Sequence, residues 1–175
     1  RDGSFFSQVD GEALATDQFG EDVGAITGRD PVIATRLVLS FSQSDVRGFT
    51  PAQWRSLEEL QGLGFRFAIE SVTDLDMDFE RLAESGFQFA KLDAEVFIAG
   101  LPIGDGAVPA ADICKYLASM GLTLIVQSIT SERQLVEILG FGALFGQGTL
   151  FGGPRPVKAQ ALRDEAPATA TAVRA

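Results

Sequence analysis

The amino-acid sequence predicts an α/β fold in which parallel strands alternate with helices. Apolar runs of strand length recur along the chain, and segments with helical spacing of apolar residues lie between them. Gly64, Gly86 and Gly121 each separate a helical segment from the next strand, as left-handed C-terminal caps do. The strands are nearly continuous in apolar residues, so helices should cover the sheet. Strict alternation of strand and helix predicts parallel strands joined by right-handed crossovers.

Six segments are predicted strands, and helix starts between them are marked by capping residues. The strands are residues 5–9, 37–41, 65–70, 87–92, 122–127 and a shorter run that ends near Gln147. Thr50 precedes Pro51, with Gln53 three residues after the cap, and Ser131 and Gln134 repeat this spacing. Two architectures fit this pattern: a doubly wound sheet and a (β/α) barrel.

The composition predicts one domain and excludes several classes of function. Of the 175 residues 46% are hydrophobic, which is ample for a core. The formal charge of −10 argues against nucleic acid, because neutralising phosphates needs clustered Lys and Arg. The same charge argues against direct contact with anionic membranes. No apolar stretch reaches the roughly 18 residues that a membrane span needs.

The absence of histidine and the single cysteine limit the kinds of catalytic and metal site that the chain can form. Without histidine the chain forms neither a His-dependent catalytic triad nor most zinc sites. Any metal would be a hard ion held by oxygen atoms. Cys114, the single cysteine, lies in an apolar helical pattern and is predicted to pack in the core, and a cytoplasmic setting fits this. The chain begins at Arg1 rather than Met, so we expect it to be part of a longer protein.

Polar residues follow the predicted strands where parallel α/β folds bind ligands. The third strand ends at Glu70 and Ser71, the fourth contains Lys91, and the last two end at Gln127 and Gln147. These side chains should converge on one mouth of the sheet. Two plainer explanations stay open. Strand ends simply meet solvent, or Lys91 and Glu70 form a structural pair, because a buried Lys is costly without a partner.

The strand ends offer few carboxylates for a metal. A hydrolytic metal site needs several acidic ligands close together, and only Glu70 and Asp93 lie at strand ends. Asp74, Asp76 and Asp78 follow at a loose calcium-loop spacing, but the run lacks the Gly and the distal Glu in register. We therefore expect a solvated loop or a helix start there.

Three segments together resemble the EAL domain, the cyclic di-GMP phosphodiesterase family. Residues 147–154, QGTLFGGP, are similar to the family's QGYLFG-x-P, which is the most specific match. Residues 91–93 are similar to its KID strand, and residues 125–135, IVQSITSERQL, to its VAEGVETEEQL. The similarity runs over residues 5–157. It implies a (β/α)8 barrel that hydrolyses cyclic di-GMP with Mg²⁺ or Mn²⁺.

The sequence departs from the family at most catalytic positions. By this resemblance only Lys91 and Gln147 match, and the changed positions are Gln8, Ser40, Gln43, Glu70, Ser71, Gln127 and Thr130. Ser or Gln cannot replace a carboxylate for a divalent ion that must ionise a water. We therefore predict a degenerate EAL domain that is not an enzyme, with no catalytic residue, no metal site and no resident cofactor.

The expected barrel is incomplete at the N-terminus of this chain. A full barrel takes about 250 residues, and the Glu-Ala-Leu signature strand of the family is absent. We predict an EAL-like barrel domain over residues 1–160. Residues 161–175 are rich in Ala and Thr without a core pattern, so they are predicted to form a mobile tail.

Within the family the chain resembles the TipF-type flagellum-assembly factors of alphaproteobacteria, most in LVLSFSQSDV and in GPRPVKAQAL. This likeness implies a cytoplasmic domain of a protein anchored in the membrane at the cell pole. Flagellar or polar proteins are the expected partners, and a homodimer is a further expectation. The leading hypothesis is a cyclic di-GMP receptor in polar flagellum assembly. Its ligand-binding residues would be Lys91, Gln147, Gln127, Glu70 and Ser71, with Phe151 as a stacking surface for a guanine.

Two other hypotheses stay open. The alternative is a ligand-free scaffold for protein–protein interaction, derived from an EAL domain. An open pocket at the strand ends would favour the receptor, and bulky side chains that fill the mouth would favour the scaffold. The third hypothesis is a surviving phosphodiesterase that uses Glu70, Asp93 and Asp74 in an unconventional way.

Overall fold

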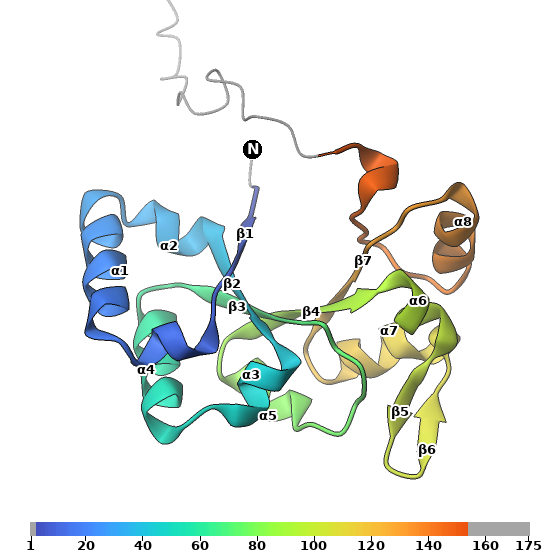
Figure 1. Cartoon of the computed structure of the whole chain (residues 1–175), viewed down its shortest axis with the longest axis horizontal. Coiled ribbons are helices and arrows are strands. Elements are labelled where there is room, and N and C mark those ends of the chain that lie inside the picture. Colours follow the sequence, from blue (N-terminus) through green and yellow to red (C-terminus); the bar gives the residue numbers. More distant parts are fainter. Residues whose placement is uncertain (1–2, 154–175) are drawn as a thin grey trace, which may run out of the picture.

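The structure is a computed structural model that describes residues 3–153, and five parallel strands form its main sheet (Figure 1). Along the sheet the order is β1 (Phe5–Gln8), β2 (Leu37–Ser42), β3 (Arg66–Glu70), β4 (Phe87–Asp93) and β7 (Thr123–Gln127). Every pairing between neighbours is parallel, as the alternation of strands and helices predicts. The predicted tail at 161–175 lies outside the described residues.

Helices connect the strands of this sheet. They are α1 (Asp17–Arg29), α2 (Val32–Arg36), α3 (Gln43–Gly48), α4 (Pro51–Gly62), α5 (Phe79–Glu84), α6 (Ala94–Ala99), α7 (Ala110–Ser119) and α8 (Glu132–Gly140), with the 3-10 helices η1 (Gly11–Ala15) and η2 (Thr149–Phe151). A small antiparallel hairpin, β5 (Leu101–Ile103) and β6 (Gly106–Val108), is separate from the main sheet. None of the helices within residues 3–153 is long and apolar enough to cross a membrane.

The main sheet curls into a half-barrel, and β1 and β7 are its two edges (Figure 1). Beyond β7 the chain adds one isolated bridge, between Val126 and Gly146. The sixth predicted strand is therefore reduced to a single bridge within the described residues. The sequence does not predict the β5–β6 hairpin, because strands of three residues are too short to show a period of two.

The predicted helix boundaries are confirmed at residues that satisfy free backbone groups. Thr50 accepts a hydrogen bond from the Gln53 N–H, and the Gln53 side chain accepts from the Thr50 N–H, so both halves of the capping box are present. Gly64, Gly86 and Gly121 have φ of +97°, +92° and +86°. In that left-handed region a glycine avoids the strain that a Cβ would add.

The two faces of the sheet differ in chemistry, and this difference positions the site. Phe41 packs against Phe67 and Phe87 with ring centroids 6.1 and 6.4 Å away, and the three rings are fully or almost fully buried. Side chains alternate along a strand, so Ser40, next to Phe41, points to the opposite, concave face, and a register shift between β3 and β4 after Phe87 brings Lys91 to that face as well. Ser40 and Lys91 lie on that concave face, and both are buried.

Cys114 lies on α7, half-buried against the core, as predicted. Burial raises the pKa of its thiol, because the charged thiolate is poorly solvated there. A raised pKa lowers the thiolate fraction at neutral pH, so this cysteine acts as a packing residue.

The aromatic core is expected to dominate stability. Replacing Phe67 with Ala should lower the free energy of unfolding by about 3–5 kcal/mol, because a buried ring is lost and a cavity remains. Urea unfolding followed by circular dichroism measures the change. The control is Phe145→Ala, at a side chain that is 55% exposed, which should cost less than about 1 kcal/mol. Equal losses for the two variants would contradict the prediction.

Candidate functional site

An open hollow lies where the carboxyl ends of the parallel strands meet. Its volume is about 470 Å³, and small-molecule sites commonly have about 300–1,000 Å³. Most of its wall is polar, and the lining residues are Phe6, Gln8, Glu70, Ser71, Lys91, Gln127, Ser128 and Gln147. Seven of them come from or directly follow β1, β3, β4 and β7, and Gln147 follows the isolated bridge at Gly146, so the site forms only when the sheet is assembled.

Lys91 lies at the base of this hollow with three partners around its ammonium group. The side chain is 5% exposed, and Nζ lies 3.1 Å from Ser40 Oγ and 3.4 Å from Glu70 Oε2. The ring of Phe6 covers the same nitrogen, with its centroid 4.5 Å away, where the face of the ring attracts a cation. These groups are the partners that a buried ammonium requires, so the predicted pairing of Lys91 with Glu70 is confirmed.

Three glutamine amides border the hollow from separate parts of the chain. Gln8 ends β1, Gln127 ends β7, and Gln147 follows the isolated bridge, with its Nε2 3.5 Å from Gln127 Oε1. The Gln147 carbonyl accepts from the Ile129 N–H at 3.1 Å. A Cβ on Gly148 would lie 2.1 Å from the Ile129 carbonyl oxygen. Only glycine lets the chain pass this close, so the placement of Gln147 depends on Gly148.

Two serines at the rim have backbone conformations that non-glycine residues rarely adopt. Ser71 follows β3 with φ of +54°, and Ser128 follows β7 with φ of +60°. Such conformations cost of order 1–3 kcal/mol and cluster at functional sites. Ser128 Oγ donates to Asp93 Oδ1 at 2.6 Å, which ties the end of β7 to the end of β4. The strained turns occur directly after Glu70 and Gln127, which line the hollow.

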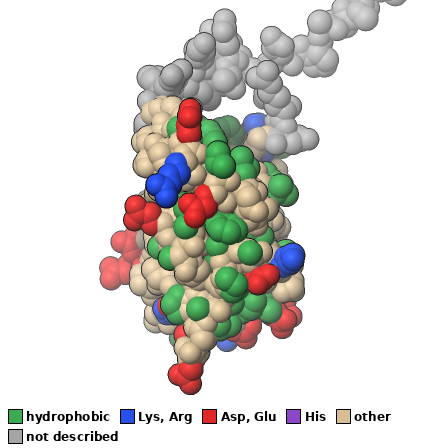
Figure 2. All heavy atoms as spheres, turned by 90° about the vertical axis from the view of Figure 1, so that its right-hand side faces the viewer, with side chains coloured by type: hydrophobic (Ala, Val, Ile, Leu, Met, Phe, Trp, Pro, Cys, Tyr) green, Lys and Arg blue, Asp and Glu red, His purple; other side chains and the backbone are tan. Residues whose placement is uncertain are grey.

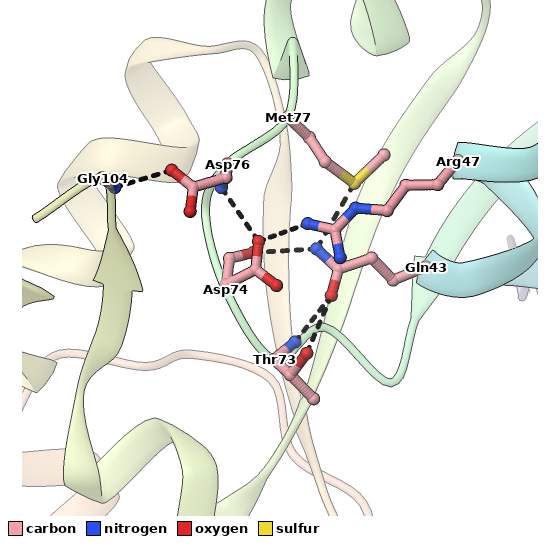
Figure 3. A network of polar contacts seen from close by, with 7 residues as sticks. All are labelled: Gln43, Arg47, Thr73, Asp74, Asp76, Met77 and Gly104. Atoms are coloured by element: carbon pink, nitrogen blue, oxygen red, sulfur yellow. Dashed lines mark hydrogen bonds and ion pairs between the residues drawn. The ribbon is translucent and has the colours of Figure 1, made fainter.

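One buried amide holds the loop that follows β3 (Figure 3). Gln43 is 2% exposed, and its Oε1 accepts from the Thr73 N–H at 2.9 Å and from Thr73 Oγ1 at 3.1 Å. Its Nε2 donates to the Asp74 carbonyl at 2.8 Å and lies 3.3 Å from Met77 Sδ. A glutamine can donate and accept at once, whereas a glutamate can only accept. The amide therefore matches this loop, and a carboxylate would not.

The three aspartates of the same loop each have a protein partner, and Figure 3 shows two of them, Asp74 and Asp76. Asp74 pairs with Arg47, and the hydrogen bond from that guanidinium holds the pKa of the Asp74 carboxyl below its ordinary value. Asp76 accepts from the Gly104 N–H at 2.6 Å. Asp78 caps α5 by accepting a backbone N–H of its first turn. The predicted helix start is confirmed at Asp78, and the loop before it is fixed by these contacts.

Five of the six predicted ligand-binding residues line the hollow together: Lys91, Gln147, Gln127, Glu70 and Ser71. Phe151 lies elsewhere. It lines a separate apolar hollow of about 350 Å³ beside α8, together with Leu144 and Phe145. The chain passes close to Ile129 at Gly148 and then turns through η2, which carries Phe151 toward α8.

Phe151 therefore belongs to an apolar surface rather than to the polar hollow. Val136, Leu139, Leu144 and Phe145 are also more than half exposed near it. Figure 2 shows apolar side chains at several places on this side of the molecule, with acidic side chains among them.

Phe6 lines the hollow without a prediction from the sequence, whereas Ser128 directly follows Gln127 at a strand end that was predicted to face this mouth. Phe6 shares a strand face with Gln8, because alternate residues of a strand point the same way, and this spacing was the available signal. Ser128 lines the hollow because its backbone has a positive φ. The sequence contains no signal for that conformation at a serine.

Carboxylates are scarce at the hollow. Among the residues that line it, Glu70 is the one carboxylate, and it is paired with Lys91. Asp93 lies nearby but accepts the hydroxyl of Ser128. Within residues 3–153, no group of three or more His, Cys, Asp or Glu side chains is placed to hold a metal ion.

Comparison with protein families identifies the class to which this fold and site belong. The EAL domain model matches residues 1–154 of the chain. The chain therefore belongs to the EAL domain family. A search of curated proteins gave no match.

Solved EAL structures share the fold at low sequence identity. The EAL domain of Xanthomonas citri FimX, in complex with c-diGMP, has a TM-score of 0.71 at 13% identity, covering 89% of this chain and 61% of that one. The EAL domain of Mycobacterium smegmatis DcpA gives 0.67 at 24% identity, with 86% and 67% covered. The EAL enzyme Bd1971, in its cAMP and cyclic-di-GMP bound form, gives 0.67 at 15% identity, with 86% and 40% covered. This chain thus spans between 40% and 67% of these chains, and the barrel-type fold class is confirmed.

The buried pair should be strongly coupled. Lys91→Met should lower the free energy of unfolding by about 3–5 kcal/mol, because it leaves the Glu70 carboxylate buried without a partner. A double-mutant cycle with Glu70→Gln, measured by urea unfolding, tests this coupling. The free energy of unfolding of the double variant should fall by clearly less than the sum of the decreases in the two single variants. The Arg47–Asp74 pair, where the Arg side chain is 41% exposed, is the control and should couple by about 1 kcal/mol or less. Additive losses at Lys91 and Glu70 would contradict the coupling.

Introducing a carboxylate at position 43 should destabilise the fold. Gln43→Glu removes the donor to the Asp74 carbonyl and buries a charge, so we expect a loss of about 1–3 kcal/mol at neutral pH. The loss should shrink on acidification, because a protonated carboxyl can again donate. Thermal unfolding at several pH values measures it, with Gln88→Glu at an exposed strand position as the control. A Gln43→Glu variant as stable as the parent at neutral pH would show that the amide is dispensable.

Proposed function

We propose that this chain is a regulatory domain that binds cyclic di-GMP without hydrolysing it. The observation that carries the proposal is the open polar hollow of about 470 Å³ at the strand ends, with the Lys91–Glu70 pair at its base. The FimX and Bd1971 structures, of the same family, contain the cyclic dinucleotide. This chain shares their fold and has an open site at its strand ends.

The lining supports binding without a metal. A divalent cation such as Mg²⁺ or Mn²⁺ prefers several oxygen ligands, carboxylates foremost. The hollow presents one carboxylate, already engaged by an ammonium, and three amides. This donor set does not fit such an ion, which argues against a metal-dependent phosphodiesterase that uses Glu70, Asp93 and Asp74.

Amides, hydroxyls and a buried ammonium suit a nucleotide ligand instead. Glutamine side chains both donate and accept, as the edges of a guanine do, and the Lys91 charge favours phosphate oxygens. Phe6 is the aromatic ring at this hollow and takes the stacking role that Phe151 was expected to fill.

The biological setting is proposed from the sequence resemblance alone. The likeness to TipF-type factors supports a degenerate EAL domain in polar flagellum assembly, with flagellar or polar proteins as partners, a paired state and a membrane-anchored parent at the cell pole. A ligand-free scaffold remains the second candidate. The open hollow favours the receptor over that scaffold, because bulky side chains do not fill the mouth.

Isothermal titration calorimetry of the full chain with cyclic di-GMP tests the receptor. We expect saturable binding that is unchanged by EDTA, and Gln127→Ala should weaken it at least about tenfold, because an amide is lost from the wall. Gln88→Ala, at an exposed amide of β4 outside the lining, is the matched control and should bind as the parent does. Chromatography after incubation with Mn²⁺ should show intact cyclic di-GMP. Absence of heat at high ligand concentration would favour the scaffold, and metal-dependent turnover would contradict the proposal.

A further inference from the structure

A further hollow, larger than the strand-end hollow, lies between α1 and α4 beside η1. Its volume is about 630 Å³. The two helices lie on the same side of the molecule (Figure 1), and η1 contacts both of them. Gln53 Nε2 donates to the Gly11 carbonyl at 2.7 Å, a buried hydrogen bond that fastens η1 to α4. This fastening sets the distance between the groove walls.

The floor of the groove is apolar and its rim is acidic. Leu14, Val23 and Leu60 form buried apolar surface beneath it. Asp17, Glu21 and Glu59 line it as exposed carboxylates, and no Lys or Arg is among its lining residues. An apolar floor between like charges is complementary to an apolar stripe flanked by cations.

Small residues on both helices leave the groove open. Gly20 and Gly24 line it from α1, and Ala52 and Ser56 line it from α4. A Cβ added at Gly20 or Gly24 would meet nothing within 4 Å, so packing inside this chain does not require glycine there. Glycine inside a helix costs about 1 kcal/mol relative to alanine. The glycines instead leave room for another backbone to approach.

From this geometry we infer that the α1–α4 groove is a docking site for an amphipathic helix of a protein partner, with a narrow apolar stripe flanked by Lys or Arg. The charge of the rim selects this occupant, because carboxylates repel nucleic acid and anionic lipid and attract cationic side chains. Helices that lie in grooves use side chains spaced by three and four residues as anchors, which the open space beside α1 can receive. The groove shares no lining residue with the strand-end hollow, so substitutions can test the two sites separately.

A synthetic peptide tests the inference on the full chain. The probe is a fluorescein-labelled helical peptide of about 18 residues, with Leu and Ala on one face and Lys on both flanks. Its counterpart has the same apolar face with Glu on the flanks. Fluorescence anisotropy should show saturable binding of the Lys peptide, at least about tenfold tighter than that of the Glu peptide. Equal binding of the two peptides, no saturation with the Lys peptide, or binding of phosphatidylserine vesicles in its place would overturn the proposal.

Two pairs of matched variants locate the binding. Gly24→Leu fills the groove, while Gly28→Leu adds the same side chain on the same helix outside the lining, where a Cβ also meets nothing within 4 Å. Glu21→Lys reverses a rim charge, while Asp22→Lys reverses a neighbouring charge outside it. Gly24→Leu and Glu21→Lys should each weaken the Lys peptide at least about tenfold, and the two controls should change it by less than about twofold.

Stability separates loss of binding from loss of fold in these variants. Both leucine variants should unfold at or above the temperature of the parent, because leucine favours a helix over glycine. A Gly24→Leu protein that is folded and binds the Lys peptide as tightly as the parent would overturn the inference. An equal loss of affinity in Gly24→Leu and Gly28→Leu would also overturn it.

Discussion

The buried ammonium of Lys91 is the constraint on which the site and the sheet both depend. A charge this far from water needs partners, and these come from Ser40 on β2, Glu70 on β3 and Phe6 on β1. All of them must sit on the concave face for Lys91 to be satisfied. A shift of one residue in strand pairing would turn that face outward and leave the ammonium against the aromatic core. The strand register that buries the aromatic core is thus the same register that gives Lys91 its partners in the hollow.

The same pair sets what the hollow can bind. Because Lys91 already holds Glu70, the base of the site is close to neutral and has no free carboxylate for a metal. Glutamine amides from three parts of the chain then define the wall, and their hydrogen bonds have direction without charge. The loop after β3, which borders Ser71, is fixed by the buried amide of Gln43. Neutral groups therefore position both the wall and this loop.

Two of the hollows within residues 3–153 differ in chemical character. The strand-end hollow is polar with one buried cation, and the α1–α4 groove is apolar with an acidic rim. Their chemistry suits different classes of ligand, a nucleotide in the first and a cationic helix in the second. The two share no lining residue, so each can be altered without touching the other.

Much of the fold could be predicted from interactions between residues close in sequence. The five strands of the sheet, the capping box at Thr50 and the left-handed glycines follow from short-range sterics and hydrogen bonding, which neighbouring residues dictate. The β5–β6 hairpin and the reduction of the sixth strand to a bridge could not be predicted in this way. Short strands carry too little periodicity, and pairing at a sheet edge depends on segments distant in sequence.

The candidate site, too, could be predicted from the sequence only in part. The sequence by itself determined that Glu70, Lys91, Gln127 and Gln147 converge, because parallel strands place their carboxyl ends along one edge. Only the tertiary structure decided that Phe6 rather than Phe151 faces the hollow, and that Gly20 and Gly24 border a groove. The first outcome depends on the close passage of Gly148 by Ile129, and the second on the hydrogen bond from Gln53 to Gly11. Both contacts join residues that are distant in sequence and come together only when the whole fold packs. A local sequence pattern therefore cannot predict them.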